Sequence, residues 1–206
     1  MCAGFTLVHA KMNKLRTCNT FISQLAIAFV LLLLHCSNSL ARGNDYEIVI
    51  SKSRQELDVT KGDLIIKHYH ISLGKGGNGT KRKLGDKKTP VGVYKIIEFK
   101  NDSRFHYFMQ LDYPNLLDAW YGYKNNVISA TVFKKIAYAY KQKQKPPQDT
   151  KLGGYIGIHG IGEENDQKLQ IHNGFNWTDG CIALTNEQII ELRKYVDIGT
   201  KVIIKE

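Results

Sequence analysis

A histidine and a cysteine in the C-terminal third of the chain are the residues best suited to chemistry. His159 lies in the sequence Gly-Ile-His-Gly, and Cys181 follows 22 residues later, directly after Asp179 and Gly180. A cysteine becomes a strong nucleophile when a neighbouring base or positive charge favours its thiolate, and histidine commonly supplies that base. We therefore expect His159 and Cys181 to form an acyl-transfer pair, provided that the fold brings them together.

Small residues beside both side chains add to this expectation. The backbone can turn sharply at Thr178-Asp179-Gly180-Cys181, so that successive N–H groups converge as an oxyanion hole. Gly160, directly after His159, leaves room for a substrate. Two plainer interpretations stay open, namely an inert buried thiol at Cys181 and a structural histidine at His159.

These residues must be positioned by a chain that is mostly strand-like from residue 45 onward. Alternating apolar residues and turn signals predict strands at 46–50, 55–60, 64–73, 90–99, 105–111, 155–159 and 201–204. Helical spacing predicts helices at 131–143 and 186–196, the second beginning with a capping box at Thr185 and Gln188. The glycine- and lysine-rich segment 74–89 is expected to be a mobile loop. The predicted fold is mainly β, in one domain.

The N-terminal segment has the features of an export signal. Residues 21–34 carry no charge, three basic residues precede them, and Ser39-Leu40-Ala41 resembles a cleavage site. We predict a signal peptide at 1–41, with translation starting at Met1 or Met12, and a catalytic domain at 42–206. An uncleaved membrane anchor is the alternative, although 14 residues is short for a span.

Cleavage after residue 41 would change both the cysteine content and the charge. It would remove Cys2, Cys18 and Cys36, and a single remaining cysteine, Cys181, cannot form an internal disulfide. It would also remove three of the 29 Lys and Arg residues, which leaves 26 against 19 Asp and Glu, a net charge of +7. Such a charge suits an anionic partner such as a cell-wall polymer, and solubility alone explains it equally well.

Metal chemistry finds little support in the sequence. His68 and His70 share one face of an expected strand, but no third ligand lies near them. His172 lies close to the candidate cysteine in sequence and could serve as a second base, with a surface histidine in a loop as the alternative. Tyr155 and Trp177 could form walls of the site or could simply pack.

Three motifs in order resemble the L,D-transpeptidase catalytic domain family, the YkuD type. His159 is followed by 18 residues and then by Thr-Asp-Gly-Cys-Ile-Ala at 178–183. The segment 85–94, Gly-Asp-Lys-Lys-Thr-Pro-Val-Gly-Val-Tyr, is similar to the family's stretch before a core strand. Ile-Ser-Leu-Gly at 71–74 is similar to another family element, so the resemblance covers roughly residues 46–204.

This resemblance implies a mixed β-sandwich or barrel-like domain with a few peripheral helices. It implies that Cys181 is the nucleophile and His159 the general base in an attack on the L,D peptide bond of a peptidoglycan stem tetrapeptide. The amides of Asp179, Gly180 and Cys181 would hold the oxyanion, with Thr178 beside them. An amine acceptor would then resolve the thioester, and neither step requires a metal or a cofactor.

Two positions depart from the family pattern. The family's usual histidine before Gly-Cys is Asp179 here, and the usual Asn or Arg two residues after the cysteine is Ala183. A carboxylate beside the nucleophile would raise the pKa of its thiol by repulsion. Asp179 could instead hold a substrate ammonium, or could simply suit the turn.

The predicted function is therefore that of an exported L,D-transpeptidase, a monomer in the periplasm associated with the cell wall. Its expected partners are peptidoglycan stem peptides and, in one variant, a wall-linked protein. Nucleic acid is not expected, and a membrane is expected only during export. The alternatives are a hydrolytic relative, either an L,D-carboxypeptidase or an amidase releasing wall-linked protein, and a catalytically silent wall-binding module.

Overall fold

The structure is a computed structural model that describes residues 45–102 and 104–206. The expected signal peptide at 1–41 lies outside these residues. None of the helices in the described part has the length and apolar character needed to cross a lipid bilayer.

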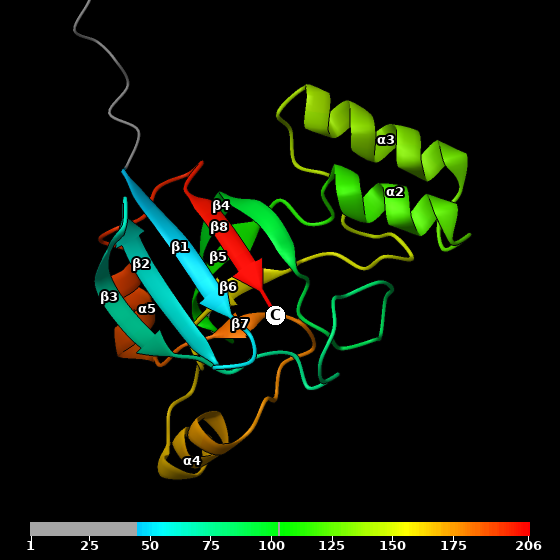
Figure 1. The fold of residues 1–206 in the computed structure, drawn as a ribbon. Helices are drawn as coiled ribbons and strands as arrows, with labels where there is room; N and C mark the ends of the chain where they lie inside the picture. The colour runs from blue at the N-terminus through cyan, green and yellow to red at the C-terminus, as the bar shows by residue number, and fades with distance from the viewer. Residues whose placement is uncertain (1–44, 103) are drawn as a thin grey trace, which may run out of the picture. The chain divides into compact units, whose positions relative to one another are not determined.

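Eight strands form one mixed sheet, as the sequence predicted for the fold class (Figure 1). The strands are β1 (Tyr46–Ser51), β2 (Glu56–Lys61), β3 (Leu64–His70), β4 (Gly92–Asp102), β5 (His106–Leu111), β6 (Gly157–His159), β7 (Ile182–Ala183) and β8 (Lys201–Lys205). Their order across the sheet is β3-β2-β1-β8-β4-β5-β6-β7. The pairs β1–β8 and β6–β7 are parallel, and the other neighbouring strands are antiparallel.

The two ends of this strand order meet at one place. Ser72, two residues after β3, exchanges both backbone hydrogen bonds with Ala183 of β7, at 3.0 and 2.8 Å. Strands β3 and β7 lie at opposite ends of the order, so this bridge closes the sheet on itself there. The closure gives the domain its barrel-like character and fixes β7 beside the segment that follows β3.

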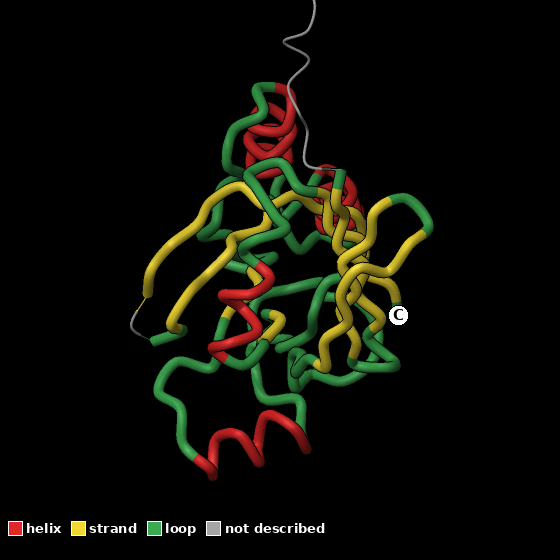
Figure 2. Tube along the Cα trace, turned by 90° about the vertical axis from the view of Figure 1, so that its left-hand side faces the viewer, coloured by secondary structure: helices red, strands yellow, loops and turns green. Residues whose placement is uncertain are grey.

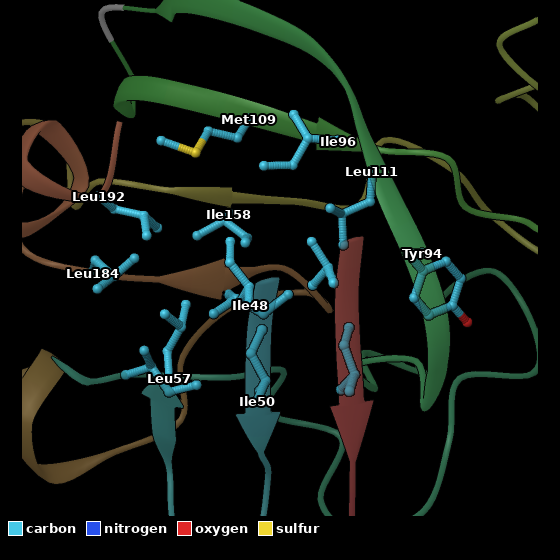
Figure 3. Packing of buried hydrophobic residues seen from close by; sticks show 14 of the residues in the cluster. Ile48, Ile50, Leu57, Tyr94, Ile96, Met109, Leu111, Ile158, Leu184 and Leu192 are labelled. Carbon is cyan, nitrogen blue, oxygen red and sulfur yellow. The ribbon is translucent and has the colours of Figure 1, made fainter. Parts of the chain in front are cut away.

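Buried side chains from both halves of the sheet form one core (Figure 3). Alternate residues of each strand point inward, among them Ile48 and Ile50 of β1 and Tyr94 and Ile96 of β4. Burying one aliphatic side chain of this size contributes about 1.5–3 kcal/mol. The core is therefore what holds the ends of β6 and β7 in place.

Within the described residues, four helices accompany the sheet: α2 (Leu116–Lys124), α3 (Ala130–Lys141), α4 (Asp166–Gly174) and α5 (Asn186–Leu192). The capping box expected at Thr185 and Gln188 opens α5, whose Ile189 and Leu192 join the core. Helices α2 and α3 lie side by side away from the sheet and have a small core of their own (Figures 1 and 2). Helix α4 lies outside the helices predicted at 131–143 and 186–196.

Candidate active site

Strand register places His159 and Cys181 on the same face of two adjacent strands. Ile158 of β6 lies opposite Ile182 of β7 in a parallel pair, and both are fully buried in the core. His159 follows Ile158, and Cys181 precedes Ile182. Since neighbouring residues of a strand point to opposite faces, the histidine and the cysteine share the face that looks away from the core. The structure thus places the two residues that the sequence selected on one face of adjacent strands.

The imidazole of His159 is held in one orientation by its surroundings. Its Nδ1 lies 2.7 Å from the carbonyl oxygen of Gly160, and the side chain is buried. A carbonyl can only accept, so Nδ1 carries the hydrogen and Nε2 carries the lone pair. The rings of Phe105 and Trp177 lie against the imidazole, with centroids at 4.4 and 5.9 Å. This tautomer is the one that a general base acting through Nε2 requires.

The thiol of Cys181 is neutral in these surroundings. Its Sγ donates to the carbonyl oxygen of Tyr155 at 3.5 Å. Burial raises the pKa of Cys181 to about 11, although the N–H of Gly157 and the charge of Lys81 act in the opposite direction. The negative charge of Asp179 adds to the increase. The nucleophile therefore needs a base to remove its proton near neutral pH.

Thr178 ties together the turn that presents the cysteine. Its hydroxyl donates to the carbonyl oxygen of Cys181 at 2.7 Å and accepts from the N–H of Gly180 at 3.1 Å. The side chain is buried, so neither bond is exchanged freely with water. Since the Gly180 amide is engaged within the turn, the amides of Asp179 and Cys181 are the better candidates for an oxyanion hole.

Gly180 has a conformation and a position that exclude a side chain. Its φ is 132°, which L-residues rarely adopt. A Cβ there would lie 2.8 Å from the carbonyl oxygen of Lys88 and 3.1 Å from Cδ1 of Ile156. The chain that leads into Cys181 therefore runs directly against the segment before β4.

The three motifs that carried the family resemblance meet at this turn. The N–H of Gly74 donates to the buried hydroxyl of Thr89 at 2.9 Å. The N–H of Lys75 donates to the carbonyl oxygen of Thr178 at 2.9 Å. A Cβ on Gly74 would lie 3.0 Å from the Cα of Gly180. Segments 71–74 and 85–94 thus form the support on which the nucleophile turn rests.

The two positions that depart from the family pattern have distinct surroundings. The carboxylate of Asp179 is largely exposed and lies 3.1 Å from Nζ of Lys75. Asp179 thus contacts the ammonium group of a lysine in the same chain, whereas the sequence had suggested a substrate ammonium as its partner. Ala183 is fully buried opposite His159 in the pairing of β6 with β7.

Gly160 and His172 have surroundings that the sequence did not indicate. A Cβ on Gly160 would lie 2.7 Å from Oδ1 of Asn186 and 2.8 Å from the carbonyl oxygen of Phe105, so its small size serves chain packing. His172 belongs to α4 and is buried beside His70, with ring centroids 6.4 Å apart, which contradicts the expectation of a surface histidine in a loop. Burial lowers the pKa of His172, which favours its neutral form.

Metal ligation is not supported in the described ranges. His68 makes a cross-strand contact with Asp58, with Nδ1 and Oδ1 at 2.7 Å. Residues 45–102 and 104–206 contain no group of three or more His, Cys, Asp or Glu side chains arranged to hold a metal ion.

The segment 74–89, expected to be a mobile loop, is instead held by many contacts. The carboxylate of Asp86 accepts from the amides of Arg82, Lys83 and Lys88 and from Nζ of Lys81. Lys81, whose charge acts on the thiol of Cys181, is a residue that the sequence did not single out. Several other lysines surround it in sequence, and no local pattern distinguishes it from them.

Fold and site together define a class of protein. The sequence model of the L,D-transpeptidase catalytic domain, YkuD, matches residues 45–204, and the chain belongs to this family. YafK of Escherichia coli strain K12, whose own assignment as an L,D-transpeptidase is provisional, is 32% identical over 160 residues. That match covers 75% of this chain and 48% of YafK, so the chain spans about half the length of the curated relatives it matches.

Solved structures support the same fold. Pgp2 of Campylobacter jejuni, described as a helical cell shape determining protein, is 23% identical with a TM-score of 0.50, over 81% of this chain and 52% of Pgp2. A point variant of Pgp2 is 24% identical with a TM-score of 0.51, over 80% of this chain and 48% of that one. At this level of identity the similarity concerns the fold alone.

Proposed function

We propose that this protein is an exported cysteine acyltransferase that acts on the stem tetrapeptides of peptidoglycan, as an L,D-transpeptidase. The observation that best supports this is the register of β6 and β7, which puts His159 and Cys181 on one face of adjacent strands. Family membership supports the substrate class. Export to the periplasm follows from the signal peptide predicted at 1–41.

The first half of the reaction forms a thioester. Sγ of Cys181 attacks the carbonyl carbon of the L,D peptide bond while Nε2 of His159 takes the thiol proton. The negative charge on the carbonyl oxygen is held by backbone N–H groups of the turn, with those of Asp179 and Cys181 the best placed. The C–N bond then breaks, and the imidazolium returns its proton to the departing amine of the terminal D-residue.

The second half releases the acyl group. An amine of a neighbouring stem attacks the thioester carbon, and His159 takes the proton that this amine loses. The C–S bond breaks and the cysteine is regenerated as a thiol. No step in this cycle consumes an oxidant or a reductant, and none is routed through a cofactor.

Hydrolysis of the same thioester is the second candidate, because Asp179 and Ala183 occupy the two positions that depart from the family pattern. In that case water replaces the amine, and the protein shortens stem peptides or releases wall-linked protein. Both candidates share the first half-reaction and differ only in the acceptor.

The test is incubation of the purified protein with tetrapeptide muropeptides, followed by mass spectrometry of the products. We expect crosslinked dimers that have lost one terminal residue, and a Cys181→Ala variant that yields none. A shortened monomer without dimer would assign the protein to hydrolysis. No product, together with no covalent adduct between Cys181 and a carbapenem, would leave a wall-binding module and overturn the proposal.

A further inference from the structure

A buried ammonium group lies in the segment between β3 and β4, which packs against the turn that presents Cys181. Lys81 is 4% exposed, whereas the lysines at 75, 83 and 87 in the same segment are exposed and Lys88 is half-buried. A lysine side chain ordinarily keeps its charge in water, since burying an unpaired charge is costly. A buried Lys81 therefore needs a partner that compensates its charge, and its burial at this place suggests a function.

The compensating partner is Asp86. Its Oδ1 lies 2.9 Å from Nζ of Lys81, and Nζ also donates to the carbonyl oxygen of Lys83 at 3.1 Å. Burial acts to raise the pKa of Asp86, but the hydrogen bonds from Lys81 and from three backbone amides outweigh it and lower that pKa. The carboxylate is thus ionised, and the ion pair fixes the ammonium in one place.

The fixed ammonium lies against the chain that contacts the thiol. A Cβ built on Gly153 would lie 3.1 Å from Cε and 3.5 Å from Nζ of Lys81. Two residues further on, the carbonyl oxygen of Tyr155 accepts from Sγ of Cys181 at 3.5 Å. A backbone hydrogen bond of 2.8 Å from Leu84 to Lys151 joins the lysine's segment to the same stretch.

We propose that Lys81 is a positioning residue of the active site, whose fixed positive charge stabilises the negative charge that develops on Cys181 during the reaction. The side chain acts through the sulfur and does not contact substrate, because it is buried. Asp86 holds Lys81 in place. The inference rests on the nucleophilic role proposed for Cys181, and it adds the source of the electrostatic stabilisation.

Among the charged groups near the thiol of Cys181, Lys81 is the best suited to stabilise negative charge on the sulfur. His159, on the same face of the adjacent strand, is the proposed base. Lys75 is exposed and paired with Asp179, whose own charge opposes the thiolate. The Lys81 ammonium acts to lower the pKa of the thiol, against the larger effect of burial. Low-dielectric surroundings strengthen a charge that solvent cannot screen, which favours the buried ammonium over the exposed one.

The experiment measures the rate of Cys181 alkylation by iodoacetamide as a function of pH, in the full chain and in Lys81→Met. Methionine keeps most of the length of the side chain without its charge. We expect the midpoint of the pH profile to rise by about 0.5–1 unit, equivalent to a roughly three- to tenfold slower reaction below the midpoint. Lys83→Met, which removes an exposed charge from the same segment, is the matched control and should leave the profile unchanged.

A second variant covers the case in which Lys81→Met fails to fold because Asp86 is left buried and unpaired. Lys81→Met/Asp86→Asn removes both charges and keeps a side-chain oxygen for the amides of Arg82 and Lys83, and it should raise the midpoint in the same direction. A folded variant of either kind with an unchanged midpoint overturns the proposal. Alkylation needs no substrate, so this outcome is independent of whether the protein proves to be a transpeptidase, a hydrolase or a wall-binding module.

Discussion

The hydroxyl of Thr178 joins the two sides of the turn that presents Cys181. It donates to the cysteine's carbonyl and accepts from the N–H of Gly180, both in a buried position. A buried polar group that loses its partner keeps the full cost of its desolvation. The geometry of the candidate nucleophile therefore depends on a hydroxyl group outside the proposed reaction.

We predict that replacing the hydroxyl of Thr178 lowers both the stability of the fold and the reactivity of Cys181. Thr178→Val keeps the shape of the side chain but leaves the N–H of Gly180 and the carbonyl of Cys181 without their partner. We expect unfolding free energy to fall by about 1–3 kcal/mol in urea denaturation. We also expect acylation by a carbapenem to slow by about tenfold or more, because the turn no longer holds the sulfur in place.

Thr178→Ser is the control for this prediction, since serine retains the hydroxyl and loses one methyl group. It should acylate at close to the original rate. If valine and serine behaved alike, the hydroxyl would have no part in positioning the nucleophile.

Helix α2 begins with a capping box formed by two residues three positions apart. Its N-cap is Asn115, which accepts from the amides of Leu117 and Asp118, and the Asp118 side chain accepts from the N–H of Asn115. This capping box is present in the sequence. The helices predicted from the sequence, at 131–143 and 186–196, nevertheless do not include this segment.

Because of the Asp118 carboxyl in this capping box, we predict that the free energy of unfolding depends on pH. Burial raises the pKa of Asp118 to about 6, while hydrogen bonds from Asn115 and the Tyr94 hydroxyl act against the increase. A carboxyl group with a raised pKa in the folded state binds its proton more tightly there than in the unfolded chain. Its contribution to stability is therefore present at low pH and is lost as pH rises from about 4 to about 6.

The measurement compares urea unfolding of the protein and of Asp118→Asn at several pH values across this interval. The stability of the original chain relative to the variant should fall by about 2 kcal/mol as pH rises from about 4 to about 6. Comparison with the variant removes the contribution of other carboxyl groups, such as Asp86, whose pKa is lowered. A constant difference between the two proteins would show that Asp118 does not titrate in this range.

For the molecule as a whole, the positive charge is concentrated in part on α3 and the segment after it. A groove of about 640 Å³ there is lined by Lys134, Lys135 and Lys145, with Tyr138 among its other walls. Nζ of Lys145 lies 2.9 Å from the carboxylate of Glu98 and 5.9 Å from the ring centroid of Tyr155. The backbone carbonyl of Tyr155 accepts from the thiol of Cys181. One lining residue of the basic groove, Lys145, therefore also contacts the residue whose carbonyl accepts from the thiol.

This distribution predicts electrostatic binding to an anionic cell-wall polymer. Retention on purified peptidoglycan should weaken when salt rises from about 0.05 M to about 0.5 M, because exposed charges are then screened within a few ångströms. Lys134→Gln/Lys135→Gln should weaken retention at low salt more than Lys194→Gln/Lys205→Gln, which removes the same charge elsewhere. Equal effects of the two double variants would assign the charge to solubility alone.

Local chemistry along the chain was sufficient to identify the candidate nucleophile, its base and most of the strands. Alternation, turn residues and the capping box at Thr185 and Gln188 act over a few residues, so a single sequence displays them. The motifs at 71–74, 85–94 and 178–183 likewise indicated the family, which the match over 45–204 confirms.

Only the tertiary structure decided which of several similar residues are buried. Lys81 among the lysines of its segment, and His172 among the histidines, are buried by contacts with residues distant in sequence. The parallel pairing of β6 with β7 is also long-range, and it is this register that places His159 and Cys181 on one face. Burial and register depend on which segments contact one another in space. Patterns over a few neighbouring residues do not determine these long-range contacts.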